Sequence, residues 1–331
     1  MERFALAAAV VLGFALTAAL CSLFVPLRRV LERREQNQQP VQSEQPRPAP
    51  LRAPLWGGLC AAAGTVAAVG VGWLVACVGQ PELLGSEGRL MTRLLTALAG
   101  SLAFGAVGLA EDLARMRSPA ALGLRRDVRL LLEALAAAFV LLLLQAAGCL
   151  PRGLDVPGAG YVLLGSAVPF LWAVLMVALA ECARIAERDE GTVCGAAFVA
   201  MLALMMAEAG LGVPGLAVLP AALAGALVAL LLWAFPPARL GVGCCGSLLA
   251  AGAIGCIPLS LDMTSLTVPL ALPFWAAGGL LAAQLLGAKR TGKPLRCWVK
   301  KHKMSPETVF LCSFALSAVG YVLALALLRW C

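Results

Sequence analysis

Positive charge alternates between the loops of this chain, and this alternation constrains the fold more than any other feature. Apolar segments are separated by polar loops, and 21 of the 26 Lys and Arg residues fall in every second loop. Loops rich in Lys and Arg stay on the cytoplasmic side of a membrane. We therefore expect an integral membrane protein with five loops in the cytoplasm and both termini outside.

Ten apolar segments are each long enough to cross a hydrocarbon core of ~30 Å as a helix. The composition agrees, because the chain is 61% hydrophobic with a mean hydropathy of +0.89. Backbone groups inside lipid are satisfied by such helices. The sequence predicts a single all-α domain over residues 1–331, a polytopic membrane helix bundle of about ten transmembrane helices. The spans are Phe4–Pro26, Leu55–Val78, Leu94–Ala110, Leu130–Leu150, Tyr161–Ala180, Thr192–Leu211, Leu216–Phe235, Gly246–Leu261, Val268–Leu286 and Val309–Trp330.

The net charge of +8 comes from the inner loops, so anionic lipid headgroups rather than nucleic acid are the expected partners. The first of these loops begins with a short basic helical extension, Arg28–Glu35. A Gln- and Pro-rich stretch, Gln36–Pro50, follows, and its composition predicts a flexible cytoplasmic tether. Most of the 12 cysteines lie in or beside apolar spans, where Cys behaves as a small hydrophobic residue.

An acidic pair closes the third predicted span. Glu111 and Asp112 are adjacent at a membrane boundary, where carboxylates are costly unless they are solvated or paired with a cation. Two such groups could hold Mg²⁺ or move a proton. They could equally form a solvated helix end, paired with Arg115 or Arg117. The residues of this loop alone leave both interpretations open.

Three further inner loops carry residues suited to phosphate chemistry. Glu181–Gly191 is rich in both acids and arginines, a combination found where metal and phosphate meet, but also in ordinary connectors. The turn Gly241–Gly246 precedes a helix start, which offers free N–H groups to an anion. The loop Gly287–Thr308 holds seven Lys or Arg and the only His, which suits a phosphate-rich substrate or the anionic leaflet.

Short motifs in these loops occur in a recognisable order. They are APLWGG at 53–58, GLAEDLAR at 108–115, LGL at 122–124 followed by Arg129 and Glu133, ECARIAERDEG at 181–191, PA at 237–238 with GCCGSL at 243–248, and KRTGK at 289–293. Together they resemble the loop motifs of the glycosyltransferase 4 family of polyprenyl-phosphate phosphoglycosyl transferases. The branch that makes peptidoglycan precursors is the most similar.

The resemblance implies a reaction, its partners and its residues. Members of this family move phospho-MurNAc-pentapeptide, or another sugar-1-phosphate, from a UDP-sugar to polyprenyl phosphate in the bacterial inner membrane, using Mg²⁺. The family pattern of three His falls either on His302 or on 296–298, and a homodimer is also left open. By resemblance the catalytic positions are Glu111, Asp112, Glu187 and Glu190, the substrate-binding positions are Arg129, Arg184, Lys293 and His302, and the metal positions are Asp112 and Cys244.

The departures from the family pattern concern its chemistry. Glu111, Glu187 and Glu190 stand where the pattern has Asp, and Arg184 stands where it has Asn. Cys244 replaces a metal-binding Asp, although Mg²⁺ prefers hard oxygen ligands to a thiol. The sequence therefore predicts weakened or lost catalysis, unless the Glu side chains rebuild a displaced metal site.

Two other classes of function stay open. A non-catalytic membrane scaffold or regulator could bind lipid phosphate, nucleotide-sugar or cell-wall enzymes in the same cleft. A transporter is less consistent with the sequence, because the spans have almost no charged residue at mid-membrane.

Overall fold

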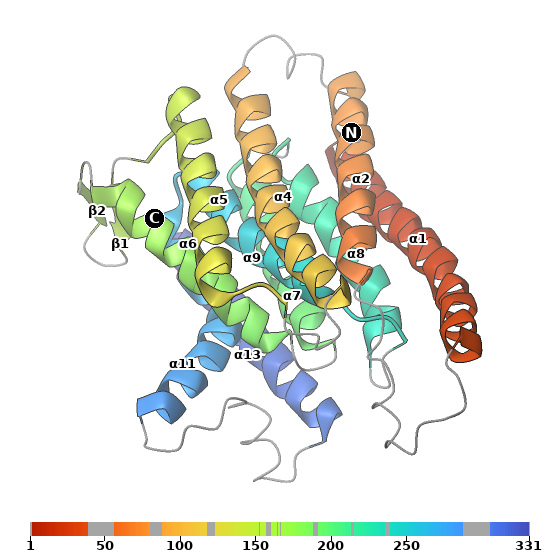
Figure 1. Cartoon of the computed structure of the whole chain (residues 1–331). Coiled ribbons are helices and arrows are strands. Elements are labelled where there is room, and N and C mark those ends of the chain that lie inside the picture. The colour runs from red at the N-terminus through yellow and green to blue at the C-terminus, as the bar shows by residue number, and fades with distance from the viewer. Residues whose placement is uncertain are drawn as a thin grey trace.

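The computed structural model describes a bundle of helices that confirms the predicted all-α, polytopic membrane fold (Figure 1). The described residues are 2–38, 56–79, 88–117, 123–151, 153–156, 160–163, 165, 167–187, 191–212, 215–235, 239–286 and 305–330. The long helices among them are α1 (Glu2–Gln38), α2 (Gly57–Gly79), α4 (Gly88–Arg117), α5 (Arg126–Ala146), α6 (Ala167–Ala186), α7 (Thr192–Gly210), α8 (Val218–Ala234), α9 (Gly243–Ser260), α11 (Leu272–Leu286) and α13 (Pro306–Trp330).

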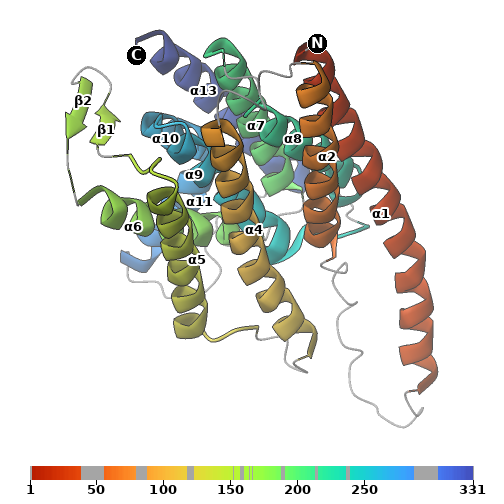
Figure 2. The same ribbon diagram turned by 90° about the horizontal axis from the view of Figure 1, so that it is seen from above.

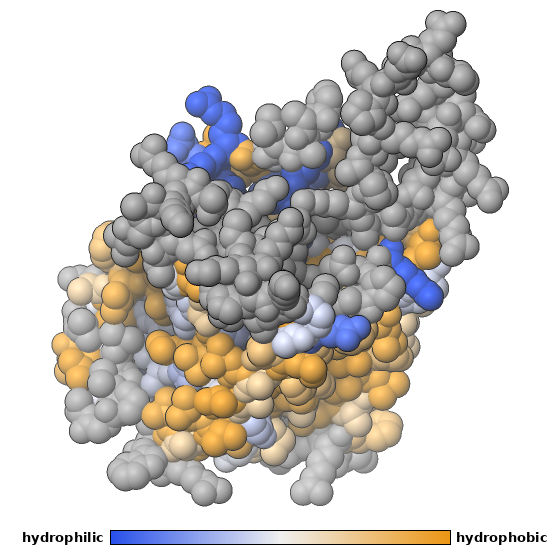
Figure 3. Space-filling model, turned by 90° about the horizontal axis from the view of Figure 1, so that it is seen from below, coloured by the Kyte–Doolittle hydropathy of each residue, from blue (hydrophilic) through white to orange (hydrophobic). Residues whose placement is uncertain are grey.

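Each predicted span overlaps one of these helices. Seven of them are long and apolar enough to cross a membrane, and α8 is a shorter apolar helix of 17 residues. Large apolar side chains cover much of the outside of the bundle, as Figure 3 shows for one face, and Phe170 on α6 is 75% exposed. An apolar exterior of this kind is what contact with lipid tails requires.

The predicted start of the fifth span and the predicted end of the third span were wrong. Tyr161 does not begin a span, because it lies in an antiparallel hairpin of β1 (Gly153–Val156) and β2 (Gly160–Leu163), and α6 begins only at Ala167. The third span does not end before Glu111, because α4 continues to Arg117. Its acidic pair therefore lies within the helix.

The third inner loop is also shorter than expected. Residues 181–186 belong to α6, so Glu181 and Arg184 project from a helix rather than from a connector. The basic extension Arg28–Glu35 is helical as expected, and α1 continues to Gln38, into the predicted tether. The rest of that tether, residues 39–50, lies outside the described residues.

The ninth span is interrupted. A 3-10 turn η1 (Thr264–Leu266) and the short α10 (Thr267–Leu270) precede α11. Pro273 has no N–H to donate to the carbonyl of Pro269 four residues earlier, so a continuous helix is disfavoured here. That carbonyl lies against Gly320 of α13, where a side chain would overlap it.

Helix α9 lies in the middle of the bundle in both Figure 1 and Figure 2, and all 18 of its residues are buried. It consists mostly of Gly, Ala, Ser, Cys and Leu, and small residues let membrane helices approach closely. A methyl group at Gly108 of α4 would overlap the backbone of Cys244. The start of α9 and the acidic end of α4 are therefore in direct backbone contact.

A second close seam joins α1, α2 and α8. Gly225 of α8 packs against the carbonyl oxygen of Val10 on α1, and Gly64 of α2 packs against the hydroxyl of Thr17. Gly70, also on α2, has nothing within 4 Å of the place where a side chain would begin.

We predict opposite effects of Gly→Ala at two of these glycines. Gly225→Ala should destabilise the protein by about 1–3 kcal/mol, because the new methyl group overlaps the Val10 carbonyl. The matched control Gly70→Ala should leave stability unchanged or raise it by about 0.5–1 kcal/mol, since Ala favours a helix over Gly. Thermal unfolding in detergent measures the stability of both variants. Equal melting temperatures would contradict the close packing of α8 against α1 at Gly225.

Candidate active site

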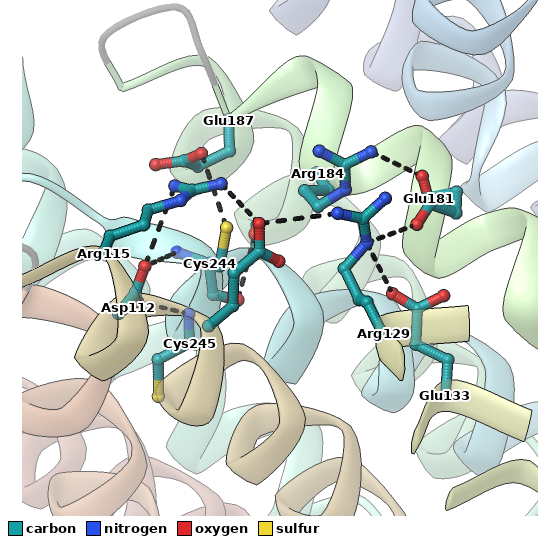
Figure 4. A network of polar contacts seen from close by, with 11 residues as sticks. Asp112, Arg115, Arg129, Glu133, Glu181, Arg184, Glu187, Cys244 and Cys245 are labelled. Carbon is teal, nitrogen blue, oxygen red and sulfur yellow. Dashed lines mark hydrogen bonds and ion pairs between the residues drawn. The ribbon is translucent and has the colours of Figure 1, made fainter. Parts of the chain in front are cut away.

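Charged side chains from four elements meet at one end of the bundle (Figure 4). The last turns of α4 and α6 and the first turns of α5 and α9 supply them. The cluster consists of Glu111, Asp112, Arg115, Arg129, Glu133, Glu181, Arg184, Glu187, Cys244 and Cys245.

Asp112 joins α4 to the start of α9. Its Oδ1 accepts the backbone N–H of Cys244 at 3.0 Å, and its Oδ2 accepts that of Cys245 at 2.9 Å. The first N–H groups of a helix have no partner within it, and a carboxylate there also meets the positive end of the helix dipole. With Asp112 only 1% exposed, the two hydrogen bonds form a buried cap supplied by another helix.

The turn before α9 is held from a third helix. Gly243 has a φ of 71°, which favours glycine, and it directs the chain into the first turn of α9. The backbone N–H of Gly58, at the start of α2, donates to the carbonyl of Val242 at 2.9 Å. Gly57 and Gly58, the last two residues of the APLWGG motif, thus position the turn that leads into the N–H groups capped by Asp112.

Arg115 pairs with both acidic residues of α4. Its Nη2 lies 2.6 Å from Oε1 of Glu111, and its Nη1 lies 3.9 Å from Oδ1 of Asp112. The expected pairing four residues along the helix is confirmed. The expectation of a solvated helix end was wrong, because Glu111 is 2% exposed and sits within α4.

A second ion-pair group lies between α5 and α6. Oε1 of Glu181 accepts a hydrogen bond from Nε of Arg129 at 2.7 Å. Its Oε2 accepts one from Nη2 of Arg184 at 2.5 Å. Arg129 also lies 3.7 Å from Oε1 of Glu111, so the two groups are connected. Glu181 and Arg184 both stand where the family pattern has Asn, and here they pair with each other.

A buried thiol occupies position 244, where the motif resemblance predicts a metal-binding Asp. The side chain of Cys244 is 0% exposed, and its Sγ lies 3.9 Å from Oε2 of Glu187. The structure brings together six of the residues that the sequence singled out, namely Glu111, Asp112, Arg129, Arg184, Glu187 and Cys244. Glu190, Lys293 and His302 lie outside the described residues.

Two members of the site, Glu181 and Glu133, lie in the motifs but were not predicted as site residues. Glu181 bridges two arginines, and its spacing of three residues from Arg184 on one helix was the available signal. Glu133 is fully buried with Arg129 Nε at 3.9 Å, and neither of its oxygens has a hydrogen-bond partner among the described residues. A carboxylate inside an apolar span was the signal for Glu133.

Among the described residues the donor set fits Mg²⁺ poorly, because the ion requires a near-octahedral set of hard oxygens at ~2.0–2.1 Å. Both oxygens of Asp112 accept backbone N–H groups, position 244 offers sulfur, and Glu111 has its Oε1 paired with Arg115 and only its Oε2 without a hydrogen-bond partner. Within the part of the chain that the structure describes, no group of three His, Cys, Asp or Glu is arranged to hold a metal ion.

Comparison with known proteins agrees with the motifs. The model of glycosyl transferase family 4 matches residues 94–262, slightly more than half of the chain. The chain belongs to glycosyl transferase family 4. The resemblance found from its motifs is confirmed, and all the described site residues lie within the region matched to this family.

Three relatives of this family 4 protein share the name phospho-N-acetylmuramoyl-pentapeptide-transferase. The protein of Mycobacterium tuberculosis (strain H37Rv) is 27% identical over 265 residues, which cover 72% of each chain. That of Synechococcus sp. (strain RCC307) is 30% identical over 63% of this chain and 55% of its own. That of Desulforudis audaxviator is 32% identical over 48% of this chain and 50% of its own.

We predict that Asp112→Asn destabilises the protein by about 1–3 kcal/mol, because an amide has only one oxygen to accept the two N–H groups of α9. The control is Asp127→Asn, an exposed Asp in the first turn of α5, which should change stability by less than about 0.5 kcal/mol. Thermal unfolding of the purified proteins decides this, and equal melting temperatures would exclude a capping role.

We further predict that Glu181→Gln and Arg184→Gln are coupled. Each single variant leaves one partly buried charge with a weakened partner, whereas the double variant removes both charges. A double-mutant cycle on thermal stability should give a coupling energy of about 0.5–3 kcal/mol. Additive effects of the two substitutions would show that the pair does not act as a unit.

Proposed function

We propose that this protein is a phosphoglycosyl transferase of family 4 whose Mg²⁺-dependent transfer is lost or strongly weakened. Its cleft binds the phosphate-bearing substrates of the family, a UDP-sugar such as UDP-MurNAc-pentapeptide and a polyprenyl phosphate. The family match and the shared name of the relatives support this substrate class. The observation that carries the loss of transfer is the buried thiol of Cys244 beside a carboxylate, Asp112, that caps a helix.

Phosphoryl transfer depends on positioning and on neutralising the charge that develops on phosphate. Cys244 removes a charge and a hard oxygen from the family's metal position. The carboxylate of Asp112 is engaged by two N–H groups, so it cannot turn toward a ligand without uncapping α9. Glu187 is one methylene longer than the Asp of the pattern, and a shift of ~1 Å in a catalytic group can cost ~100-fold in rate.

The orientation of the site follows from the basic loops. The cluster lies where α4 and α6 end and where α5 and α9 begin, at the ends joined by the Lys- and Arg-rich loops. We therefore place the cleft on the cytoplasmic face of the bacterial inner membrane, with both termini outside.

A non-catalytic scaffold is the second candidate. The ion pair of Arg129 on α5 with Glu181 on α6 joins these two helices, and Arg184 on α6 pairs with the other oxygen of Glu181. A cleft kept in shape in this way can still present a binding surface for lipid phosphate or nucleotide-sugar after the chemistry is lost.

Mg²⁺-dependent exchange of labelled UMP with UDP-MurNAc-pentapeptide, in membranes that contain only this transferase, separates these functions from an active enzyme. The natural protein should give exchange close to background. Cys244→Asp should raise any exchange, because it restores a hard anionic oxygen, and Cys244→Asn is the matched control of similar size without the charge.

The gain from one substitution should be small, since residues that act as a unit are not additive. Adding Arg184→Asn and Ala234→Asn, which restore two further family positions, should raise the exchange more. Turnover by the natural protein at an ordinary ~1–1000 s⁻¹, together with a fall in Cys244→Asp, would show that the site works in its present form.

A further inference from the structure

One guanidinium lies among the groups that the family pattern assigns to metal and catalysis. Arg115 contacts Glu111 at 2.6 Å and Asp112 at 3.9 Å, and its charge also acts on Glu187. Figure 4 shows the Arg115 guanidinium next to the Glu187 carboxylate and above the sulfur of Cys244. A cation is therefore already present where these side chains converge.

The position of Arg115 is fixed by packing as well as by charge. The loop between α4 and α5 returns over it at Gly123, whose φ of 69° favours glycine. A methyl group at Gly123 would lie 3.0 Å from Cγ of Arg115, so the loop packs against the stem of this side chain. Arg115 is thus positioned by packing of its stem against Gly123 and by the ion pair of its guanidinium with Glu111.

Arg115 is also the most accessible of the three arginines in the cluster. Its side chain is 24% exposed, against 12% for Arg184 and 8% for Arg129. A guanidinium has five N–H donors in a planar fork, and its contacts with two carboxylates do not use all of them. It can therefore hold Glu111 and still donate to a phosphate.

We propose that Arg115 takes the place of a divalent cation in this cleft and binds the phosphate of the ligand without metal. The inference rests on the proposed function, because it concerns how the same cleft holds a phosphate-bearing substrate. Arginine suits this use, since it stays charged at all relevant pH values and matches phosphate oxygens with paired hydrogen bonds.

Glu187 gives a test whose sign differs between the two modes of binding. If a metal ion held the phosphate, the negative charge of Glu187 beside it would help to hold that ion, and Glu187→Gln would weaken binding. If Arg115 holds the phosphate, the Glu187 carboxylate repels it, and Glu187→Gln should strengthen binding. Glu187 directly follows α6 and is half-buried, so this substitution leaves the ion pairs of Glu181 intact.

The experiment measures binding of labelled UDP to the full-length protein in detergent, with either EDTA or Mg²⁺ present. A second arm uses polyprenyl phosphate in nanodiscs, and the arm that responds shows whether nucleotide or lipid supplies the phosphate. We expect Kd values within about twofold in EDTA and Mg²⁺. Arg115→Gln should weaken binding about tenfold or more, the equivalent of ~1.4 kcal/mol, and Arg115→Lys by less. Arg117→Gln is the matched control, because Arg117 is exposed on the same helix and should be neutral.

Four results would overturn the proposal: binding that requires Mg²⁺, weaker binding in Glu187→Gln, no binding of either probe in EDTA, or unchanged affinity in Arg115→Gln. The last result would assign the phosphate to another cation. The proposed function is tested separately from this inference. Ordinary Mg²⁺-dependent exchange would refute the loss of transfer even if UDP bound equally well in EDTA and in Mg²⁺.

Discussion

The contact between the Asp112 carboxylate and the first turn of α9 is the interaction on which this architecture depends. It joins the helix at the centre of the bundle to α4 through two hydrogen bonds that water does not reach. The glycines at 58 and 108 let α2 and α4 approach the same turn. Because α9 is buried along its whole length, a shift of its first turn would move the packing surface of α2, α4, α6 and α7.

Hydropathy was sufficient to locate the membrane helices, because burial in lipid requires length and apolar composition in each segment separately. It could not place the start of α6, since Tyr161 and its neighbours are apolar yet form a hairpin. Nor could it show that Pro269 and Pro273 divide the ninth span. Helix ends depend on turn chemistry and on packing, which average hydropathy does not record.

Six members of the described site were predictable from the sequence, but their contacts were not. Alternating loops bring Asp112 and Cys244 to one side of the membrane, so their proximity follows from topology. The way in which Asp112 uses both oxygens on α9, and in which Glu181 shares its oxygens between two arginines, depends on the rotation of each helix. Glu181 and Arg184 look like two unrelated departures from the Asn pattern in the sequence. In the structure they form one ion pair.

The complete burial of α9 has a consequence for how this family's site can change over generations. At a position with no exposure, a thiol needs no partner, whereas a carboxylate needs a cation or a hydrogen bond. A mutation that leaves Cys at position 244 is therefore tolerated in one step. The reverse mutation is tolerated only if Arg115 or another cation is free to pair with the restored charge. Substitution at position 244 is in this sense easier from a carboxylate to a thiol than from a thiol to a carboxylate.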